Sequence, residues 1–294
     1  MATPAEWTAG ARPRTLPAAA APVLVGTGAA IQANGWDQPA RSTLLALLAL
    51  GVALALQVGV NYANDYSDGV RGTDLDRVGP LRLTAAGLAT PARVKAAAFT
   101  AFGVGAVLGM VLVGLTGHVW LLAVGAIAIA AAWFYTGGAH PYGYQGLGEV
   151  GVFVFFGLVA VLGSTYIQIS RITWPAVAGA VGVGLLACGL LMINNLRDIP
   201  TDALVGKRTL AVRLGDRRAR RVYVAMITIP IILGVACAIA APWSLLVLLL
   251  TLPVALLSVT VLLGARGRAL VPVLAGTGML ELAYGMLLGL GLSL

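Results

Sequence analysis

Apolar runs long enough to cross a lipid bilayer recur from one end of the chain to the other. A membrane-spanning helix needs about 20 mostly apolar residues, and it satisfies its own backbone hydrogen bonds in hydrocarbon. Only 10% of the 294 residues are charged, against about a quarter in a typical soluble domain. The sequence therefore predicts an all-α, polytopic membrane protein formed by a single domain over residues 1–294. We place nine transmembrane helices, at roughly 15–33, 43–66, 93–115, 118–136, 149–169, 174–195, 220–240, 243–264 and 270–293.

The basic residues indicate how these helices are oriented. If the N-terminus is cytoplasmic, every Lys and Arg except Arg41 and Arg171 falls in a segment on the cytoplasmic side. This asymmetry is the one described by the positive-inside rule. We therefore expect a multi-pass protein of the cell inner (plasma) membrane with a cytoplasmic N-terminus. The net charge of +8 follows from this topology, so no nucleic-acid partner is expected.

Most of the acidic residues gather on the same face, in two long connections. Each connection begins at the end of an apolar segment, where Asn and Asp recur at steps of three or four and so share one face of a helix. Pro200 lies inside the second group, so we expect that helix to kink or end near Asp198 and Asp202 to follow in a turn. The first group is Asn61, Asn64, Asp65 and Asp68, and the second is Asn194, Asn195, Asp198 and Asp202.

Two such groups beside basic residues are typical of a site for Mg²⁺ and a diphosphate. Mg²⁺ prefers oxygen ligands, usually a few carboxylates together with substrate phosphate oxygens. Neither zinc nor a redox metal is expected, because His118 and His140 are isolated and Cys188 and Cys237 lie in separate apolar runs. A diphosphate with a hydrocarbon tail fits this location. The predicted metal ligands are Asn61, Asn64, Asp65, Asp68, Asp198 and Asp202, and the predicted diphosphate-binding residues are Arg71, Lys207, Arg208 and Asn195.

Four stretches of the sequence resemble a known family. The chain resembles the UbiA superfamily of intramembrane aromatic prenyltransferases, which carries two Asp-rich motifs. Within the superfamily it is most similar to the members that prenylate 1,4-dihydroxy-2-naphthoate in menaquinone synthesis. The four stretches are "ARPRTLPAAAAPVLVG" (11–26), "NYANDYSDGVRGTD" (61–74), "YTGGAHPYGYQGLGEV" (135–150) and "NNLRDIPTDALVGKRTLAVRLG" (194–215).

The resemblance implies a nine-helix bundle around a central cavity, open to lipid and capped by the two long cytoplasmic loops. It implies transfer of a polyprenyl group from polyprenyl diphosphate to 1,4-dihydroxy-2-naphthoate, with Mg²⁺ as cofactor. Gly72 stands where the superfamily often has a further Asp, and whether Asp74 replaces it stays open. The residues that match the motifs are Asn61, Asp65 and Asp68 in the first and Asp198 and Asp202 in the second.

The implied reaction assigns roles to further residues. Loss of diphosphate gives the prenyl C1 the character of an allylic cation, and the naphthoate ring attacks it, with the new bond replacing a carboxylate that leaves as CO₂. An aromatic face stabilises a cation, and Tyr135 is the candidate, with Trp133 and Phe134 beside it. Arg14 is the first candidate to bind the acceptor carboxylate, and Arg197 is the second. The plainer interpretations, an interfacial aromatic for Tyr135 and a positive-inside anchor for Arg14, stay open.

Two other functions stay open. One is a related prenyltransferase with a different aromatic acceptor. The other is a secondary transporter, although transporter sites lie near the bilayer midplane and these acids concentrate at one rim. Glu149 is interpreted as a first-turn helix acid, and Glu281 as a lone intramembrane acid with no identified partner. Small-residue faces such as residues 103–114 leave a homo-oligomer open.

Overall fold

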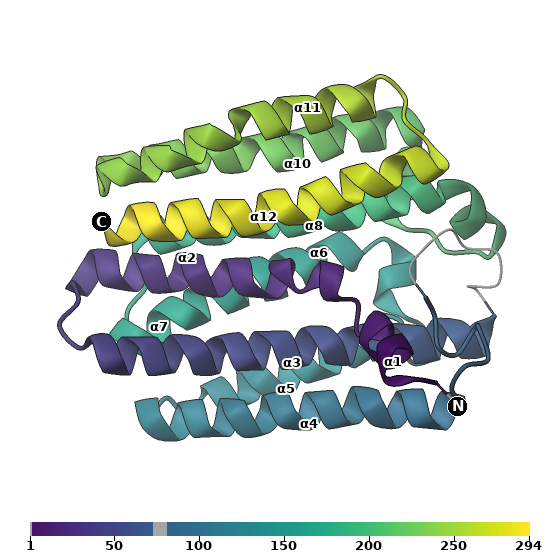
Figure 1. The fold of residues 1–294 in the computed structure, drawn as a ribbon, viewed down its shortest axis with the longest axis horizontal. Helices are drawn as coiled ribbons and strands as arrows, with labels where there is room; N and C mark the ends of the chain where they lie inside the picture. The colour runs from purple at the N-terminus through teal and green to yellow at the C-terminus, as the bar shows by residue number, and fades with distance from the viewer. Residues whose placement is uncertain (1, 73–80) are drawn as a thin grey trace.

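The computed structural model describes residues 2–72 and 81–294, and all regular structure in those residues is helical. The helices lie roughly side by side in one elongated bundle (Figure 1). The longer elements are α2 (Pro17–Asn34), α3 (Pro39–Arg71), α4 (Pro91–Thr116), α5 (Leu121–Phe134), α8 (Trp174–Leu204), α10 (Asp216–Ala236), α11 (Thr251–Leu262) and α12 (Leu270–Ser293). The shorter elements are α1 (Pro4–Gly10), η1 (Pro13–Thr15), η2 (Tyr142–Gln145), α6 (Gly148–Val152), η3 (Phe153–Leu162), α7 (Gly163–Ile169), α9 (Leu210–Leu214), η4 (Cys237–Ile239), η5 (Pro242–Leu250) and η6 (Gly267–Ala269).

The all-α prediction is confirmed, but the count of nine spans is not. Seven helices in the described part of the chain are long and apolar enough to cross a membrane. An eighth span results if Pro4–Thr15 and Pro17–Asn34, which are bent by 47° at their junction, count as one. α5 has only 14 residues, or about 21 Å at 1.5 Å per residue, and is shorter than a hydrocarbon core of about 30 Å.

The main core of the protein lies between α2, α8, α10 and α12. Met192 of α8, Tyr223 of α10 and Leu288 of α12 are completely buried in it. Where α2 meets α12, a Cβ placed on Gly28 would lie only 2.3 Å from the carbonyl oxygen of Gly289. Small residues let membrane helices approach this closely, so Gly28 and Gly289 allow α2 to pack directly on α12.

Gly28→Ala is expected to destabilise the protein by about 1–3 kcal/mol, because the backbone of Gly289 must move to admit the methyl group. Gly103 of α4 is the matched control, since a Cβ there would have no atom within 4 Å. Thermal unfolding of Gly28→Ala and Gly103→Ala in the same detergent measures the difference. Equal unfolding midpoints for the two variants would contradict this packing of α2 on α12.

Two helices that carry the acidic clusters end at the same end of the bundle. α3 and α8 both run toward the end where the N-terminal segment and the long connections lie (Figure 1). α3 extends to Arg71, five residues beyond the predicted span, so Asp65 and Asp68 are both helical. The chain thus brings two segments separated by more than 100 residues to one rim.

The sequence predicts a kink or an end of the second acidic helix near Asp198, and the end is wrong. α8 continues to Leu204 with Pro200 inside it, so Asp202 lies on the same helix as Asp198, one turn further along. Proline removes one backbone hydrogen bond from a helix. The bond missing here is the one that the Leu196 carbonyl would accept from residue 200, and α8 continues without it. The Thr201 hydroxyl adds a hydrogen bond in the same turn, to the Asp198 carbonyl oxygen, at 3.0 Å. The whole second cluster, from Asn194 to Asp202, therefore lies on one continuous helix.

Candidate active site

One large cavity runs through the described part of the bundle. Its volume is about 1420 Å³, above the roughly 300–1,000 Å³ of typical small-molecule pockets. The walls come from α2, α3, α4, α5, the α6–η3–α7 segment, α8 and α12, and most lining side chains are apolar. Gly109 of α4 and Gly125 of α5 line it where a Cβ would meet nothing within 4 Å. The interior therefore offers room for a long hydrocarbon chain.

The charged residues that line this cavity are all arginines. No Asp or Glu among the described residues belongs to the lining. Arginine presents a planar set of donors that matches carboxylate and phosphate oxygens. The cavity therefore combines an apolar interior with side chains that bind anions. The five arginines are Arg12 and Arg14 of the N-terminal segment, Arg82, Arg197 of α8, and Arg268 just before α12.

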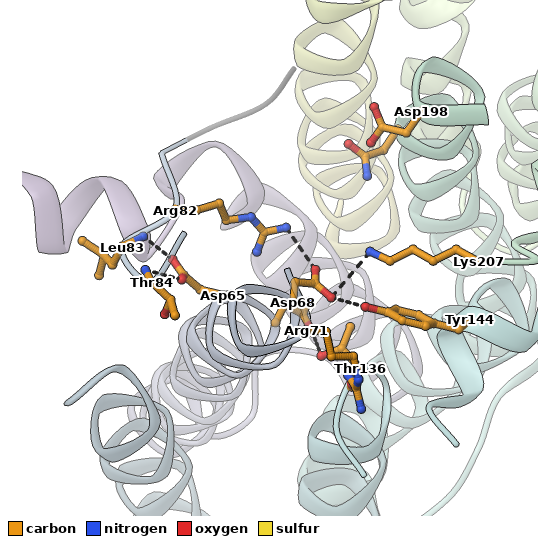
Figure 2. Close-up of polar contacts among 12 residues, drawn as sticks. Asp65, Asp68, Arg71, Arg82, Leu83, Thr84, Thr136, Tyr144, Asp198 and Lys207 are labelled. Atoms are coloured by element: carbon orange, nitrogen blue, oxygen red, sulfur yellow. Dashed lines mark hydrogen bonds and ion pairs between the residues drawn. The ribbon is translucent and has the colours of Figure 1, made fainter. Parts of the chain in front are cut away.

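Asp68, near the end of α3, lies at the centre of a buried polar cluster (Figure 2). Its Oδ1 accepts a hydrogen bond from the Tyr144 hydroxyl and lies 3.5 Å from Lys207 Nζ. Its Oδ2 lies 3.4 Å from the Arg82 guanidinium. Lys207 Nζ is also 4.5 Å from the ring centroid of Tyr144, a cation–π contact. The side chains of Asp68, Arg82 and Lys207 are 10% exposed or less, so two buried cations converge on one carboxylate.

Asp65 has a different set of contacts from Asp68 (Figure 2). One oxygen accepts the backbone N–H of Leu83, at 2.7 Å, and the other accepts that of Thr84, at 2.9 Å. The residue is completely buried and does not line the cavity. Asp65 thus fixes the segment that follows residue 80 against α3. That segment includes Arg82, so Asp65 also positions the cation that contacts Asp68.

The amides of the first cluster tie neighbouring segments to α3. Asn61 Nδ2 donates to the carbonyl oxygen of Ala11, at 2.8 Å, and to Thr15 Oγ1, at 2.9 Å. Asn64 Oδ1 accepts a hydrogen bond from the Thr136 hydroxyl, at 2.7 Å. Both asparagines line the cavity. They therefore hold the N-terminal segment and the segment after α5 around its opening.

The second cluster is paired within α8 and with α6. Arg197 contacts both oxygens of Asp198, at 2.6 and 2.7 Å, and donates to Asn194 Oδ1 at 2.9 Å. Asn195 donates to Glu149 Oε1 at 3.2 Å, and both residues are buried. Arg197 and Asn194 line the cavity, whereas Asn195 does not. The side chain of Asn195, which the sequence predicts to bind the diphosphate, thus contacts Glu149 in the first turn of α6.

The three basic residues predicted to bind diphosphate lie in different settings. Lys207 belongs to the buried cluster around Asp68. Arg71 donates to the carbonyl oxygens of Thr136 and Gly138, in the segment after α5. The side chain of Arg208 is exposed, and only its backbone N–H contacts this region. The structure therefore brings Lys207 to the cluster and places Arg71 and Arg208 around it.

Of the three predicted aromatic residues, only Tyr135 lines the cavity. Trp133 packs instead against Tyr66, with 5.9 Å between ring centroids, and Phe134 is 53% exposed. Neighbouring residues on a helix point about 100° apart, so three consecutive residues cannot all face one cavity. Trp133 and Phe134 are therefore corrected to residues outside the cavity wall.

Other aromatic residues complete the wall. Tyr142 lies edge-on to Tyr135, with 5.5 Å between ring centroids, and burial raises the pKa of its hydroxyl to about 12. Phe155 and Phe156 line the cavity from η3, a π-helical segment of ten residues. π-helical turns are rare and frequently occur at functional sites. Neither Tyr142 nor the two phenylalanines is among the site residues that the sequence predicts.

The predicted metal ligands do not form a carboxylate cluster. Among residues 2–72 and 81–294, no three His, Cys, Asp or Glu side chains are arranged to hold a metal ion. Asp198 lies on α8, and Asp68 lies on α3 (Figure 2). Asp202 is buried near the end of α8. Asp74, whose role the sequence left open, is outside the described residues.

Glu281 has the setting expected of a lone intramembrane acid. It lies on α12 and is completely buried. Neither of its oxygens has a hydrogen-bond partner in the described residues. Its role stays open.

Three residues of the site were missed in the sequence. Tyr144, whose hydroxyl donates to Asp68, is not among the predicted site residues. Arg82 was counted only among the loop cations, and Arg268 only as a positive-inside residue. The weak signal for Tyr144 is its place within "PYGYQGLGE", one of the stretches that carry the resemblance. Arg82 and Arg268 have no local signal, because their placement depends on which helices are neighbours.

The fold and the cavity are those of a helical membrane protein with room for an anionic ligand that has a long apolar part. Residues 19–285 match the sequence model of the UbiA prenyltransferase family. The chain belongs to the UbiA prenyltransferase family, as the resemblance in its sequence indicated.

Similar proteins include the 1,4-dihydroxy-2-naphthoate octaprenyltransferase of Mycobacterium tuberculosis, 53% identical over 97% of this chain and 96% of the relative. The Escherichia coli protein of the same name is 43% identical over 75% of this chain and 72% of its own length. Among solved structures, the apo UbiA homologue of Aeropyrum pernix K1 aligns with a TM-score of 0.69 at 17% identity, covering 93% of this chain and 96% of its own. A UbiA homologue of Archaeoglobus fulgidus solved with GPP and Mg²⁺ aligns with a TM-score of 0.63 at 14% identity, covering 96% and 99%.

Proposed function

We propose that this protein transfers a polyprenyl group from polyprenyl diphosphate to 1,4-dihydroxy-2-naphthoate, with loss of CO₂ and diphosphate, giving demethylmenaquinol. The cavity carries the proposal, because its interior is apolar and its charged lining residues are all arginines. Such a site fits a donor with a diphosphate head and a hydrocarbon tail, and an acceptor that is an aromatic carboxylate. The activity named for the mycobacterial and E. coli relatives supports the same reaction.

The residues of the site have distinct parts in this reaction. The C1–O bond of the donor breaks with its electron pair on the diphosphate, and Arg82 and Lys207 bind that anion as it leaves. Tyr135 and Tyr142 stabilise the allylic cation with their ring faces. The ring carbon that bears the carboxylate forms the new C–C bond. CO₂ then leaves and its bonding pair returns to the ring, so atoms and charge balance.

The donor atoms of the two clusters fit Mg²⁺. Mg²⁺ is usually held by one or two carboxylates with substrate phosphate oxygens, and seldom by an all-protein cage. Asp68, Asp198 and Asp202, with Asn64, would supply the protein's share of the ligands once a diphosphate is bound. Mg²⁺ would neutralise charge on the departing diphosphate. The Archaeoglobus homologue solved with GPP and Mg²⁺ supports a divalent ion in this fold.

The proposed topology has nine membrane-spanning segments, with α5 as the shortest and α2 joined to its bent N-terminal extension. The N-terminus and the mouth of the cavity face the cytoplasm, in the cell inner membrane. This orientation rests on the side where Lys and Arg concentrate. A water-soluble naphthoate would then reach the arginine-lined mouth from the cytoplasm while the prenyl tail stays in the bilayer.

Arg14 and Arg268 are the residues that we assign to the acceptor carboxylate. Both line the cavity, and within the described residues neither guanidinium has a hydrogen bond or ion pair. Arg197, the second candidate from the sequence, already contacts both oxygens of Asp198. The carboxylate of a bound acceptor would therefore bind to the guanidinium groups of Arg14 and Arg268.

Arg268→Met is expected to raise the KM for 1,4-dihydroxy-2-naphthoate about tenfold, with little change in the KM for polyprenyl diphosphate. The reason is that a hydrogen bond to a charged group contributes about 1.5–3 kcal/mol. Arg266→Met is the matched control, since Arg266 is 79% exposed and does not line the cavity. An unchanged acceptor KM in Arg268→Met would contradict the assignment, as would an equal rise in Arg266→Met.

An acceptor swap tests the proposed function against its alternatives. The purified full chain in lipid would receive polyprenyl diphosphate with either 1,4-dihydroxy-2-naphthoate or 4-hydroxybenzoate, and the product would be read by mass spectrometry. A prenylated naphthoquinol that has lost the carboxylate is the expected result. A prenylated benzoate alone would favour a sibling enzyme. A protein that moves a solute and forms no covalent product with any acceptor would be a transporter.

A further inference from the structure

Gln57 is a buried polar residue on the cavity wall that the proposed reaction has not used. It lies on α3, one helical turn before Asn61, and is only 7% exposed. Its Nε2 donates to Thr15 Oγ1, at 3.0 Å, and to Asn61 Oδ1, at 3.3 Å. Its Oε1 is buried and has no hydrogen-bond partner in the described residues.

The hydrogen bonds around Gln57 fix which atom of its amide is the oxygen. The Thr15 hydroxyl donates its only proton to the Arg12 carbonyl oxygen, at 3.0 Å. It can therefore only accept from Gln57, and the atom facing it must be the Nε2 donor. Asn61 Nδ2 donates to the carbonyl of Ala11, which turns Asn61 Oδ1 toward Gln57. Both neighbours thus leave Gln57 Oε1 as the unsatisfied acceptor.

Gln57 lines the cavity, and its unpaired oxygen lies just behind that surface. Such a group favours a ligand that donates a hydrogen bond and draws the oxygen toward the cavity. Buried polar groups without partners are few in native proteins, and each one costs free energy until it is satisfied. The ionised diphosphate and the prenyl tail have no donor to offer. Of the two substrates, only 1,4-dihydroxy-2-naphthoate has donors, and these are its two hydroxyl groups.

The geometry and the chemistry of the acceptor select one of those hydroxyls. The 1-hydroxyl is adjacent to the 2-carboxylate and donates to it within the molecule, whereas the 4-hydroxyl is free to donate elsewhere. Arg14, assigned to the carboxylate, directly precedes Thr15, which contacts Gln57. Arg14 and Gln57 also line the same cavity. That arrangement suits an aromatic ring with a carboxylate at one position and a hydroxyl at another.

We propose that Gln57 Oε1 accepts a hydrogen bond from the 4-hydroxyl of the naphthoate acceptor and so selects dihydroxylated over monohydroxylated rings. This inference rests on the proposed function. It assigns Gln57 to substrate specificity, in addition to the part that its Nε2 has in holding η1 against α3.

Binding of two acceptors measured on the full chain tests this inference. The ligands are 1,4-dihydroxy-2-naphthoate and 1-hydroxy-2-naphthoate, which lacks only the 4-hydroxyl, titrated by calorimetry in lipid without oxygen and without prenyl diphosphate. We expect the wild type to bind the dihydroxy compound about tenfold more tightly, the effect of one hydrogen bond. In Gln57→Met, a variant of similar side-chain length, the two dissociation constants should become equal within about twofold. Gln57→Asn, which withdraws the oxygen by one methylene, should lose the preference too and serves if Gln57→Met fails to fold.

Gln168→Met is the matched control for these variants. Gln168 also has a buried, unpaired Oε1, and its Nε2 donates to Thr27 Oγ1 and to the Ser164 carbonyl oxygen, both at 3.0 Å. It does not line the large cavity, so this variant should keep the wild-type preference. The inference is overturned if wild type shows no preference, or if Gln57→Met and Gln57→Asn keep it. Those results leave the proposed function intact as long as wild type forms the prenylated naphthoquinol. If wild type neither binds nor prenylates the naphthoate, the proposed function itself fails.

Discussion

Replacing Asp68 with asparagine is expected to lower kcat by about 100-fold or more while the protein still folds. Asp68 is the carboxylate on which Tyr144, Lys207 and Arg82 converge. Asparagine keeps the shape and can still accept from Tyr144, but it removes the negative charge. Lys207 and Arg82 then repel each other, and a hard oxygen ligand for Mg²⁺ is weakened. Losing about 3 kcal/mol of transition-state stabilisation corresponds to a rate loss of this size.

The measurement is kcat with both substrates saturating, together with thermal unfolding to establish that the variant is folded. Asp216→Asn is the matched control, because Asp216 pairs with Arg220 at 2.8 Å and does not line the cavity. It should keep wild-type turnover. Full activity in Asp68→Asn would remove Asp68 from the site. An equal loss in Asp216→Asn would mean that removing a negative charge lowers turnover wherever it lies in the protein.

Asp65→Ala is expected to abolish turnover and also to lower stability by about 2 kcal/mol or more. Both oxygens of Asp65 accept backbone N–H groups of the segment that follows residue 80. Alanine leaves two buried N–H groups unsatisfied, at a cost of about 1–3 kcal/mol each. It also releases the segment that positions Arg82 beside Asp68. Turnover should therefore fall together with stability, because Arg82 is no longer held beside Asp68.

Thermal unfolding and turnover, with turnover measured well below both unfolding midpoints, separate the two effects. Asp216→Ala is the control for stability, because an ion pair with a half-exposed carboxylate contributes about 1 kcal/mol or less. If Asp65→Ala unfolds at the wild-type midpoint, the assigned anchoring contacts are wrong. If it is destabilised but fully active, Asp65 is purely structural and has no part in arranging the site.

Hydropathy predicted the helices well because it depends on local sequence. Each predicted span coincides with helical structure, and α8 begins at Trp174, where the expected span begins. The end of α8 was missed because proline can either end a helix or be accommodated inside it, and the local sequence does not distinguish the two. The span count differs because α5 is a short helix and because α2 is long enough only together with its bent N-terminal extension. The sequence does not show where α5 begins and ends, so its length could not be predicted.

The site could be predicted only in part, because its contacts join distant segments. The steps of three and four correctly placed Asp65 and Asp68 on one helix. They could not tell that Asp65 binds a loop backbone while Asp68 meets Tyr144 and Lys207. Trp133 and Phe134 show the same limit. They adjoin Tyr135 in the sequence, but in the structure only Tyr135 lines the cavity. Arg268 reaches the cavity mouth only because α12 packs along α2 and α8.

The stoichiometry of the reaction with a labelled acceptor shows whether prenyl transfer replaces the carboxylate and needs Mg²⁺. The purified full chain would be given polyprenyl diphosphate and 1,4-dihydroxy-2-naphthoate carrying ¹⁴C in its carboxylate, with Mg²⁺ or with EDTA. Released CO₂, released diphosphate and prenylated naphthoquinol would be counted. Equal amounts of all three are expected with Mg²⁺, and none with EDTA. A prenylated product that keeps the label, diphosphate release without a prenylated product, or full turnover in EDTA would contradict the proposed reaction.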